Sequence, residues 1–309
     1  MIDAAVASTV LEGSRLSWNI VADIRQLFLF SFMVNAFRAG TIVAVTAGAL
    51  GWFMLLRRQA FAGHTLAIVS FPGAAGAILI GISVVVGYFA AAIAAALVIA
   101  AVPRSPGGRA RTSESAIVGT VQAFALACGA LFVSLYGGFL SGLTGLLFGS
   151  FLGVSPGQVD ALLAVAAAAL AVLGVIARPL FFASVDQDVA EARGVPVRFL
   201  SGLFLVLLGC AAAEVSQITG ALLVFALLVM PAATAQRVTA RPMASFWLTI
   251  AVGLVVVWLA LAAAYYSVYP VGFFVTTFGF AAFVIAAAGR TAASRSGRVR
   301  VPAHAGLTP

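Results

Sequence analysis

Two side chains in the apolar parts of this 309-residue chain could bind a metal ion: His64 and Glu214. Imidazole suits zinc better than it suits hard, oxygen-seeking ions. A charge at the centre of a bilayer costs about 2.5 to 3.5 kcal/mol on insertion scales, so each buried acid needs a reason. Glu214 and Gln217 stand together at the expected outer end of a span, where they either line an entrance for cations or lie in the wet interface. His64 is either a structural histidine or a ligand.

The residue types that are missing exclude several chemistries. All 17 basic residues are arginine, so the chain has neither a phosphate-binding loop ending in Gly-Lys-Ser/Thr nor a Schiff-base lysine. It contains no H-E-x-x-H motif, and no Ser-His-Asp set can be assembled. Cys128 and Cys210 lie in apolar runs without C-x-x-C spacing. We therefore expect a protein that is not an enzyme and binds no cofactor, with any ATP bound by a separate chain.

The elements that position these residues are predicted to be transmembrane helices. The chain is 63% hydrophobic and 8% charged, with a mean hydropathy of +1.15, whereas an average globular chain carries about 25% charge. We predict an all-α, polytopic transmembrane helical bundle of about 8–9 spans, each near the 20 residues that a bilayer-crossing helix needs. The expected spans lie near residues 28–56, 65–82, 83–102, 115–136, 159–177, 199–214, 219–235, 245–265 and 271–289.

The arginines predict the orientation of the bundle. Alternate connections and the tail hold 14 of the 17 arginines, and arginines near span ends stay on the cytoplasmic side. The amino terminus is therefore expected outside and the carboxyl terminus in the cytoplasm. This topology explains the net charge of +8 better than nucleic-acid binding does. Residues 1–26 form an extracytoplasmic polar or interfacial lead, 27–289 the membrane domain, and 290–309 a basic cytoplasmic tail that is predicted to be disordered.

One short soluble segment, residues 181–197, lies between two spans on the cytoplasmic side. Asp186 is a plausible N-cap, Asp188 adds an acid in the first turn, and Gly194 with Pro196 ends the helix. About two turns of helix are expected here, although a loop alone would be enough to connect the two spans. The segment is either a docking helix for a partner's groove or a solvated linker helix.

Prolines interrupt two of the expected spans. Pro231 removes a backbone hydrogen bond inside an apolar run and predicts a kink or an early helix end, and Pro72 with Gly73 interrupts an earlier span. Kinked helices with small residues line the paths of many transporters, but proline is also tolerated in ordinary spans.

Four segments together resemble the membrane permeases of ATP-binding-cassette importers for zinc, manganese and iron. They occur in that family's order and spacing, as RRQAFAGHTLAIVSFPG (57–73), LFGSFLGVSPGQV (147–159), VDQDVAEARGVPV (185–197) and TGALLVFALLVMPAATA (219–235). The resemblance implies a multi-pass protein of the cell membrane that forms a homodimer around a central path. It also implies cytoplasmic ATPase subunits that hydrolyse ATP and an extracytoplasmic metal-binding protein that delivers the ion.

The resemblance also assigns roles to single residues. The positions that match the family's coupling helix, which contacts the ATPase, are Asp186, Asp188, Ala190, Ala192 and Gly194. Independently of the resemblance, we assign Pro72, Gly73, Gln217 and Pro231 to the translocation path or its kinks.

The chain departs from the family at the expected metal site. In many members an aspartate follows the glycine equivalent to Gly63, and a histidine comes four residues later, which places two ligands on one helical face. Here those positions hold His64 and Ile68, and Glu214 is the candidate that could contribute from another helix. A permease for chelated iron or a cobalamin-like ligand is the alternative within this class, and a non-transporting membrane scaffold is the alternative outside it. An ion-driven transporter would carry more buried acids.

Overall fold

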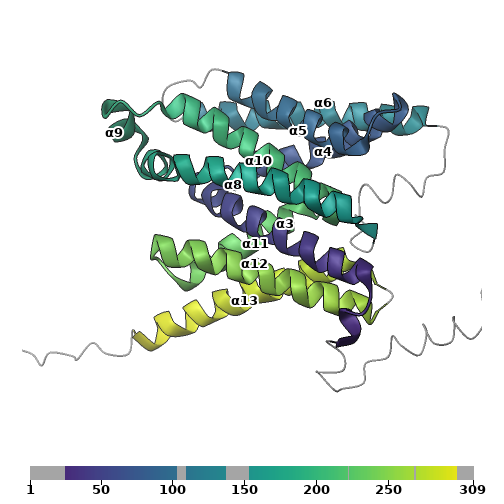
Figure 1. Ribbon diagram of the computed structural model, residues 1–309. Coiled ribbons are helices and arrows are strands. Elements are labelled where there is room, and N and C mark those ends of the chain that lie inside the picture. The colour runs from purple at the N-terminus through teal and green to yellow at the C-terminus, as the bar shows by residue number, and fades with distance from the viewer. Residues whose placement is uncertain (1–24, 103–108, 137–152, 222, 268, 298–309) are drawn as a thin grey trace, which may run out of the picture.

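The regular structure of the chain is helical throughout the described residues. The computed structural model describes residues 25–102, 109–136, 153–221, 223–267 and 269–297, and within these ranges it contains helices and no strand (Figure 1). This confirms the all-α prediction. The helices are α3 (Ser31–Leu56), α4 (Ala60–Leu79), α5 (Val84–Ala101), α6 (Arg109–Leu135), α8 (Pro156–Val185), α9 (Gln187–Ala192), α10 (Val197–Thr219), α11 (Val224–Val238), α12 (Pro242–Tyr265) and α13 (Val271–Gly297).

Eight of the described helices are long and apolar enough to cross a membrane, which confirms the predicted number of spans. α11 differs because its 15 residues reach only about 22 Å, less than the ~30 Å hydrocarbon core of a bilayer. It starts five residues later than the span predicted at 219–235. The connection before it is buried at Gly220 and Ala221, and Gly220 has a φ of 78°, a conformation that favours glycine.

Local signals explain where helices begin and how they continue. Ser155 and Gln158 form a capping box at the start of α8, with Ser155 Oγ accepting from the Gln158 amide at 3.3 Å. Pro156 occupies the first helical position, where its missing N–H costs nothing. Pro231 lies inside α11, which continues to Val238, so the helix does not end early at this proline.

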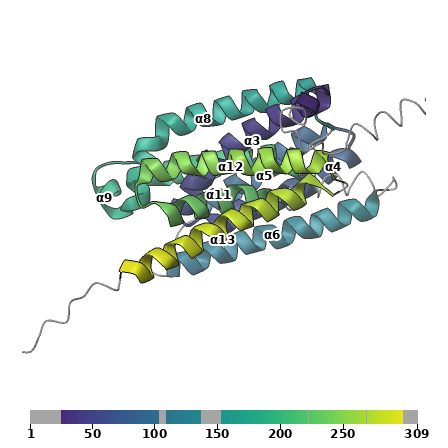
Figure 2. The same ribbon diagram turned by 90° about the horizontal axis from the view of Figure 1, so that it is seen from below.

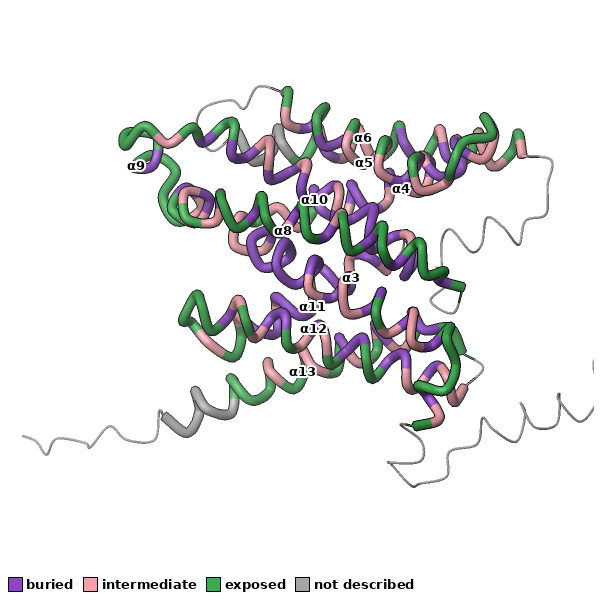
Figure 3. Tube along the Cα trace, in the orientation of Figure 1, coloured by how far each residue is buried: buried purple, intermediate pink, exposed green. Residues whose placement is uncertain are grey.

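The bundle has a buried centre and an apolar rim. In both α3 and α10, 72% of the most apolar window is buried, against 17% in α6 and 22% in α13 (Figure 3). Large apolar side chains on the rim are exposed, including Trp247, Phe280 and Ile285. A helix that is apolar all round is either buried in protein or faces lipid. We therefore expect α3 and α10 to form the core of the bundle and α6 and α13 to face lipid.

The two ends of the bundle differ. α9 projects from one end, beyond α8 and α10, and the end of α13 lies at that same end (Figures 1 and 2). α13 extends to Gly297, into the segment predicted as the tail, while 298–309 lie outside the described residues. Most of the predicted polar lead, residues 1–24, also lies outside them.

Candidate functional site

Glu214 carries a carboxyl group in the centre of the bundle whose two oxygens have no hydrogen-bond partner among the described residues. It lies on α10 with 0% exposure. Thr46 of α3 approaches it, but the Thr46 hydroxyl donates to the Ile42 carbonyl at 2.9 Å. A buried polar group left without a partner costs about 1 to 3 kcal/mol, so such a group calls for an explanation. Its complete burial leaves the interfacial alternative for Glu214 without support.

His64 lies where α4 meets α10 and α11. Its ring packs edge-on against Phe225 of α11, with 4.9 Å between ring centroids, and its Nδ1 is buried without a hydrogen-bond partner in the described chain. The preceding residue, Gly63, packs tightly against Met54 of α3, and a Cβ there would also lie 3.5 Å from Leu208 Cδ2 of α10. Ile68, the position of the family's second ligand, is half-buried one turn further along α4.

These two residues supply three unused polar atoms of the kinds that bind divalent metals: two carboxylate oxygens and one imidazole nitrogen. They lie on helices that contact each other. The described residues nevertheless contain no group of three or more His, Cys, Asp or Glu side chains that could hold a metal ion. Glu214 and His64 are therefore at most part of a ligand set in this conformation.

A buried break in the helical backbone separates α10 from α11, a few residues later than the break expected between the spans 199–214 and 219–235. α10 ends at Thr219, α11 begins at Val224, and the intervening Gly220 and Ala221 are buried. Non-helical backbone at membrane depth is tolerated only where protein buries it or where it lines a cavity, and transporters build substrate sites at such breaks. The signal in the sequence was Gly220, which lies inside the apolar run expected as the span 219–235 and marks the end of the preceding helix.

The side chains predicted to line the path make helix-packing or local contacts. Pro72 packs against α6, where a Cβ on Gly129 would lie 3.1 Å from Pro72 Cγ, and Gly73 packs tightly against Gly87 and Ala91 of α5. Pro231 is buried and faces α12, and Gln217 donates from Nε2 to the Ala213 carbonyl at 3.4 Å, which leaves Glu214 unsatisfied.

α9 combines an outward face with one inward anchor. Asp186 caps it, with its carboxylate accepting from the Val189 amide at 3.0 Å, and Gly194 ends it with a φ of 78°. Ala190 is fully buried against Ala183 and Val197. Four of the five residues predicted to contact a partner are exposed, namely Asp186, Asp188, Ala192 and Gly194. Ala190 instead holds α9 on the ends of α8 and α10.

Arg57 connects the segments around α9, and sequence reasoning counted it only as an inner-side arginine. It ends α3, and its guanidinium donates to Ser184 Oγ of α8 at 3.2 Å and to Ser201 Oγ of α10 at 2.6 Å. It also donates to Gln59 Oε1 at 3.4 Å and lies over the Phe204 ring, 5.6 Å from its centroid. One side chain thus joins the α3–α4 turn to both helices that flank α9.

Residues 29–290 match the ABC 3 transport family, and the chain belongs to this family. A manganese transport system membrane protein, MntC, from Halalkalibacterium halodurans is 29% identical over 79% of this chain and 81% of its own length. The manganese import system permease protein ScaB of Streptococcus gordonii is 30% identical, over 69% of this chain and 74% of its own. The chelated iron transport system membrane protein YfeC of Yersinia pestis is 29% identical, over 74% and 76%.

Two solved structures share the fold. PsaBC from Streptococcus pneumoniae in complex with Fab superposes with a TM-score of 0.76 at 26% identity, covering 86% of this chain and 95% of that one. An inward-facing metal-chelate type transporter superposes at 0.64 and 20% identity, over 91% and 96%, which supports the fold alone. The chain is a multi-pass permease of the cell membrane, as the sequence resemblance predicted.

Proposed function

We propose that this chain is the permease subunit of an importer for divalent metal ions, with manganese or iron as cargo. The observation that carries the proposal is the fully buried Glu214 carboxylate, whose two oxygens have no hydrogen-bond partner among the described residues. The names of the relatives favour manganese or iron over zinc, which the sequence resemblance also allowed.

Glu214 and His64 bind the ion during its passage. A carboxylate suits manganese and iron, and the imidazole adds a ligand that retains the metal when some water has been lost. Glu214 has 0% exposure, so the described state is closed around it and the helices must separate for the ion to enter or leave. The buried break between α10 and α11 supplies a backbone that can move without breaking a continuous helix. Access to the two sides of the membrane therefore alternates.

A separate ATPase drives this alternation through α9. The chain has no lysine and hence no phosphate-binding loop of its own, and α9 presents the acidic side chains Asp186, Asp188 and Glu191 at one end of the bundle. Ala190 anchors α9 on the ends of α8 and α10, and Arg57 joins these two helices to the end of α3, so a force on α9 reaches the helix that carries Glu214. A second copy of the chain and an extracytoplasmic metal-binding protein complete the importer.

The test is uptake of radioactive Mn²⁺ by vesicles that contain the permease, its ATPase and the binding protein. We expect ATP-dependent uptake that stops when the ATPase is omitted and that is lost in Glu214→Gln. Cys210→Ala is the matched control, because Cys210 lies one turn earlier on α10 and is half-buried. Uptake at the wild-type rate without the ATPase would contradict the proposal.

Transport of a metal chelate is the second candidate. It is favoured by Ile68, which replaces a family ligand with an apolar side chain, and by the chelated-iron relative. A chelate brings its own ligands, so Glu214→Gln would then leave uptake unchanged. Competition between free Mn²⁺ and a ferric hydroxamate for the same vesicles separates the two candidates.

A further inference from the structure

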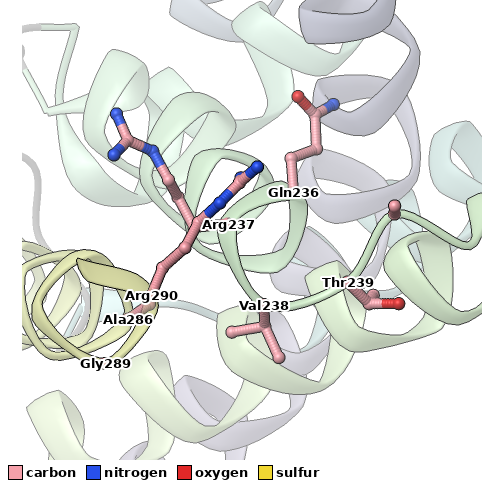
Figure 4. Close-up of a pocket in the computed structure, with 8 residues that line it drawn as sticks. Gln236, Arg237, Val238, Thr239, Ala286, Gly289 and Arg290 are labelled. Carbon is pink, nitrogen blue, oxygen red and sulfur yellow. The ribbon is translucent and has the colours of Figure 1, made fainter. Parts of the chain in front are cut away.

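A cavity between α11 and α13 carries two arginines that the proposed transport function does not use. It has a volume of about 540 Å³ and lies where both helices approach their carboxyl ends, with Arg237 from α11 and Arg290 from α13 along its wall (Figure 4). Gln236 and Thr239 add an amide and a hydroxyl. The cavity therefore presents two positively charged hydrogen-bond donors, the guanidinium groups of Arg237 and Arg290.

Within the described part of the chain, no side chain neutralises these two charges. Among the described residues, no carboxylate forms an ion pair with Arg237 or Arg290. Arg237 lies over the Phe283 ring at 5.3 Å from its centroid, a contact that orients the guanidinium without balancing its charge. Two like charges on one cavity repel each other, so an anion placed between them is favoured.

The position of the cavity indicates which anion. It lies at the end of the bundle from which α9 projects, which the distribution of arginines assigns to the cytoplasmic surface (Figures 1 and 2). Val238, in its wall, is 61% exposed, and Ile285, which directly precedes the lining residue Ala286 on α13, is 71% exposed. The charged cavity therefore borders apolar surface of the kind that lipid chains cover.

Gly289 lines the cavity without a side chain. A Cβ at this residue would meet no heavy atom within 4 Å, so the missing side chain leaves room and causes no packing defect. A larger side chain here can fill the space without a clash at its Cβ.

We propose that this cavity binds the phosphate group of an anionic phospholipid, with Arg237 and Arg290 as its partners and the acyl chains along the exposed apolar surface beside it. Guanidinium groups bind phosphate oxygens through paired, charge-assisted hydrogen bonds, and basic pockets between transmembrane helices on the cytoplasmic side bind lipid headgroups. Inorganic phosphate shares this chemistry, but it would leave the apolar border unused. The inference rests on the predicted orientation and does not depend on the cargo.

The experiment uses the full-length permease alone, purified in detergent. Its melting temperature is measured with added phosphatidylglycerol, phosphatidylcholine or inorganic phosphate. We expect phosphatidylglycerol to raise the melting temperature in a saturable way and the other two not to. The double variant Arg237→Gln/Arg290→Gln is expected to weaken the apparent affinity for phosphatidylglycerol by about tenfold or more. Arg241→Gln is the control, because Arg241 is exposed at the same end and outside the cavity.

Further variants separate the site from general attraction to charge. Gly289→Leu keeps both arginines but fills the cavity, and it is expected to abolish the shift. An unchanged shift in Gly289→Leu or in the double variant would overturn the proposal, as would an equal shift with phosphatidylcholine or inorganic phosphate. In a separate copurification with the ATPase, loss of the ATPase from a double variant whose lipid shift persists would show that the arginines contact a protein partner and that the lipid site is wrong. A failed uptake assay does not affect any of these results.

Discussion

Arg57 and Glu214 are both ionisable side chains inside the bundle, and they differ in their hydrogen bonds. Arg57 has its guanidinium shared among Ser184, Ser201 and Gln59, with an aromatic ring beneath it. Glu214 is more deeply buried and has no hydrogen-bond partner in the described structure. A polar side chain whose hydrogen bonds are made within the protein stabilises the fold, whereas one without partners is available to bind a ligand.

The contrast has an energetic consequence. Removing a satisfied buried charge leaves its partners unpaired and costs stability, while replacing an unsatisfied one by an apolar group of similar shape is neutral or stabilising. Substitutions at the two residues should therefore separate stability from transport.

The largest effect is expected at Glu214. Glu214→Leu should reduce manganese uptake by about 100-fold or more, because loss of a metal ligand exceeds the effect of losing its supporting groups. Its free energy of unfolding should stay the same or rise by ~1 kcal/mol, because an orphaned carboxylate is removed. Uptake in vesicles and thermal unfolding in detergent measure the two quantities. If Glu214→Leu unfolds more easily than the wild type, Glu214 stabilises the fold, and the contrast drawn with Arg57 is wrong.

The next effect is expected at Arg57 and has the opposite pattern. Arg57→Gln should lower the free energy of unfolding by about 1.5 to 3 kcal/mol, the range for a hydrogen bond to a charged group. Arg58→Gln is the control, since Arg58 is the adjacent, exposed residue. In a double-mutant cycle, Ser201→Ala should add little once Arg57 has been replaced. Equal free energies of unfolding for Arg57→Gln and Arg58→Gln would show that the hydrogen bonds of Arg57 do not stabilise the fold.

Some of this could be predicted from the sequence because the signals are local. Composition and hydropathy predict an all-α membrane bundle, and Asp186 with Gly194 predicts α9, since caps and stops act within a few residues. The roles of Arg57 and Ala190 depend on distant partners: Ser184 and Ser201 lie 127 and 144 residues from Arg57. The break between α10 and α11 was expected at residues 215–218 and lies after Thr219, because the apolar residues around it hide the end of the helix. Glu214 could be selected from the sequence because acidic residues are rare in the spans, but only the three-dimensional structure shows that its oxygens lack hydrogen-bond partners among the described residues.

A smaller effect is expected on α9, where an inward and an outward alanine lie two residues apart. Ala190→Glu should lower the free energy of unfolding by about 1 to 3 kcal/mol, because it forces a charge between Ala183 and Val197. Ala192→Glu should leave stability within ~0.5 kcal/mol, since Ala192 is exposed. Both should reduce copurification of the ATPase, the first by displacing α9 and the second by obstructing its outer face. Normal ATPase binding by Ala192→Glu would show that this face is not the docking surface.

The smallest effect is expected at His64. His64→Ala should raise the manganese concentration for half-maximal uptake by about tenfold while Glu214 still binds the ion. Ile68→Ala on the same helix is the matched control, because it removes apolar volume and no ligand atom. If both variants show the wild-type dependence on manganese, His64 is a structural residue packed on Phe225.

The central claim is that the unsatisfied carboxylate of Glu214 binds the cargo. Electron paramagnetic resonance of Mn²⁺ titrated into the purified permease, without the metal-binding protein and without nucleotide, tests it most directly, because it separates bound from free manganese. The account predicts a bound-manganese signal in the wild type and in Arg57→Gln that is absent in Glu214→Gln. The same bound signal in Glu214→Gln would contradict it.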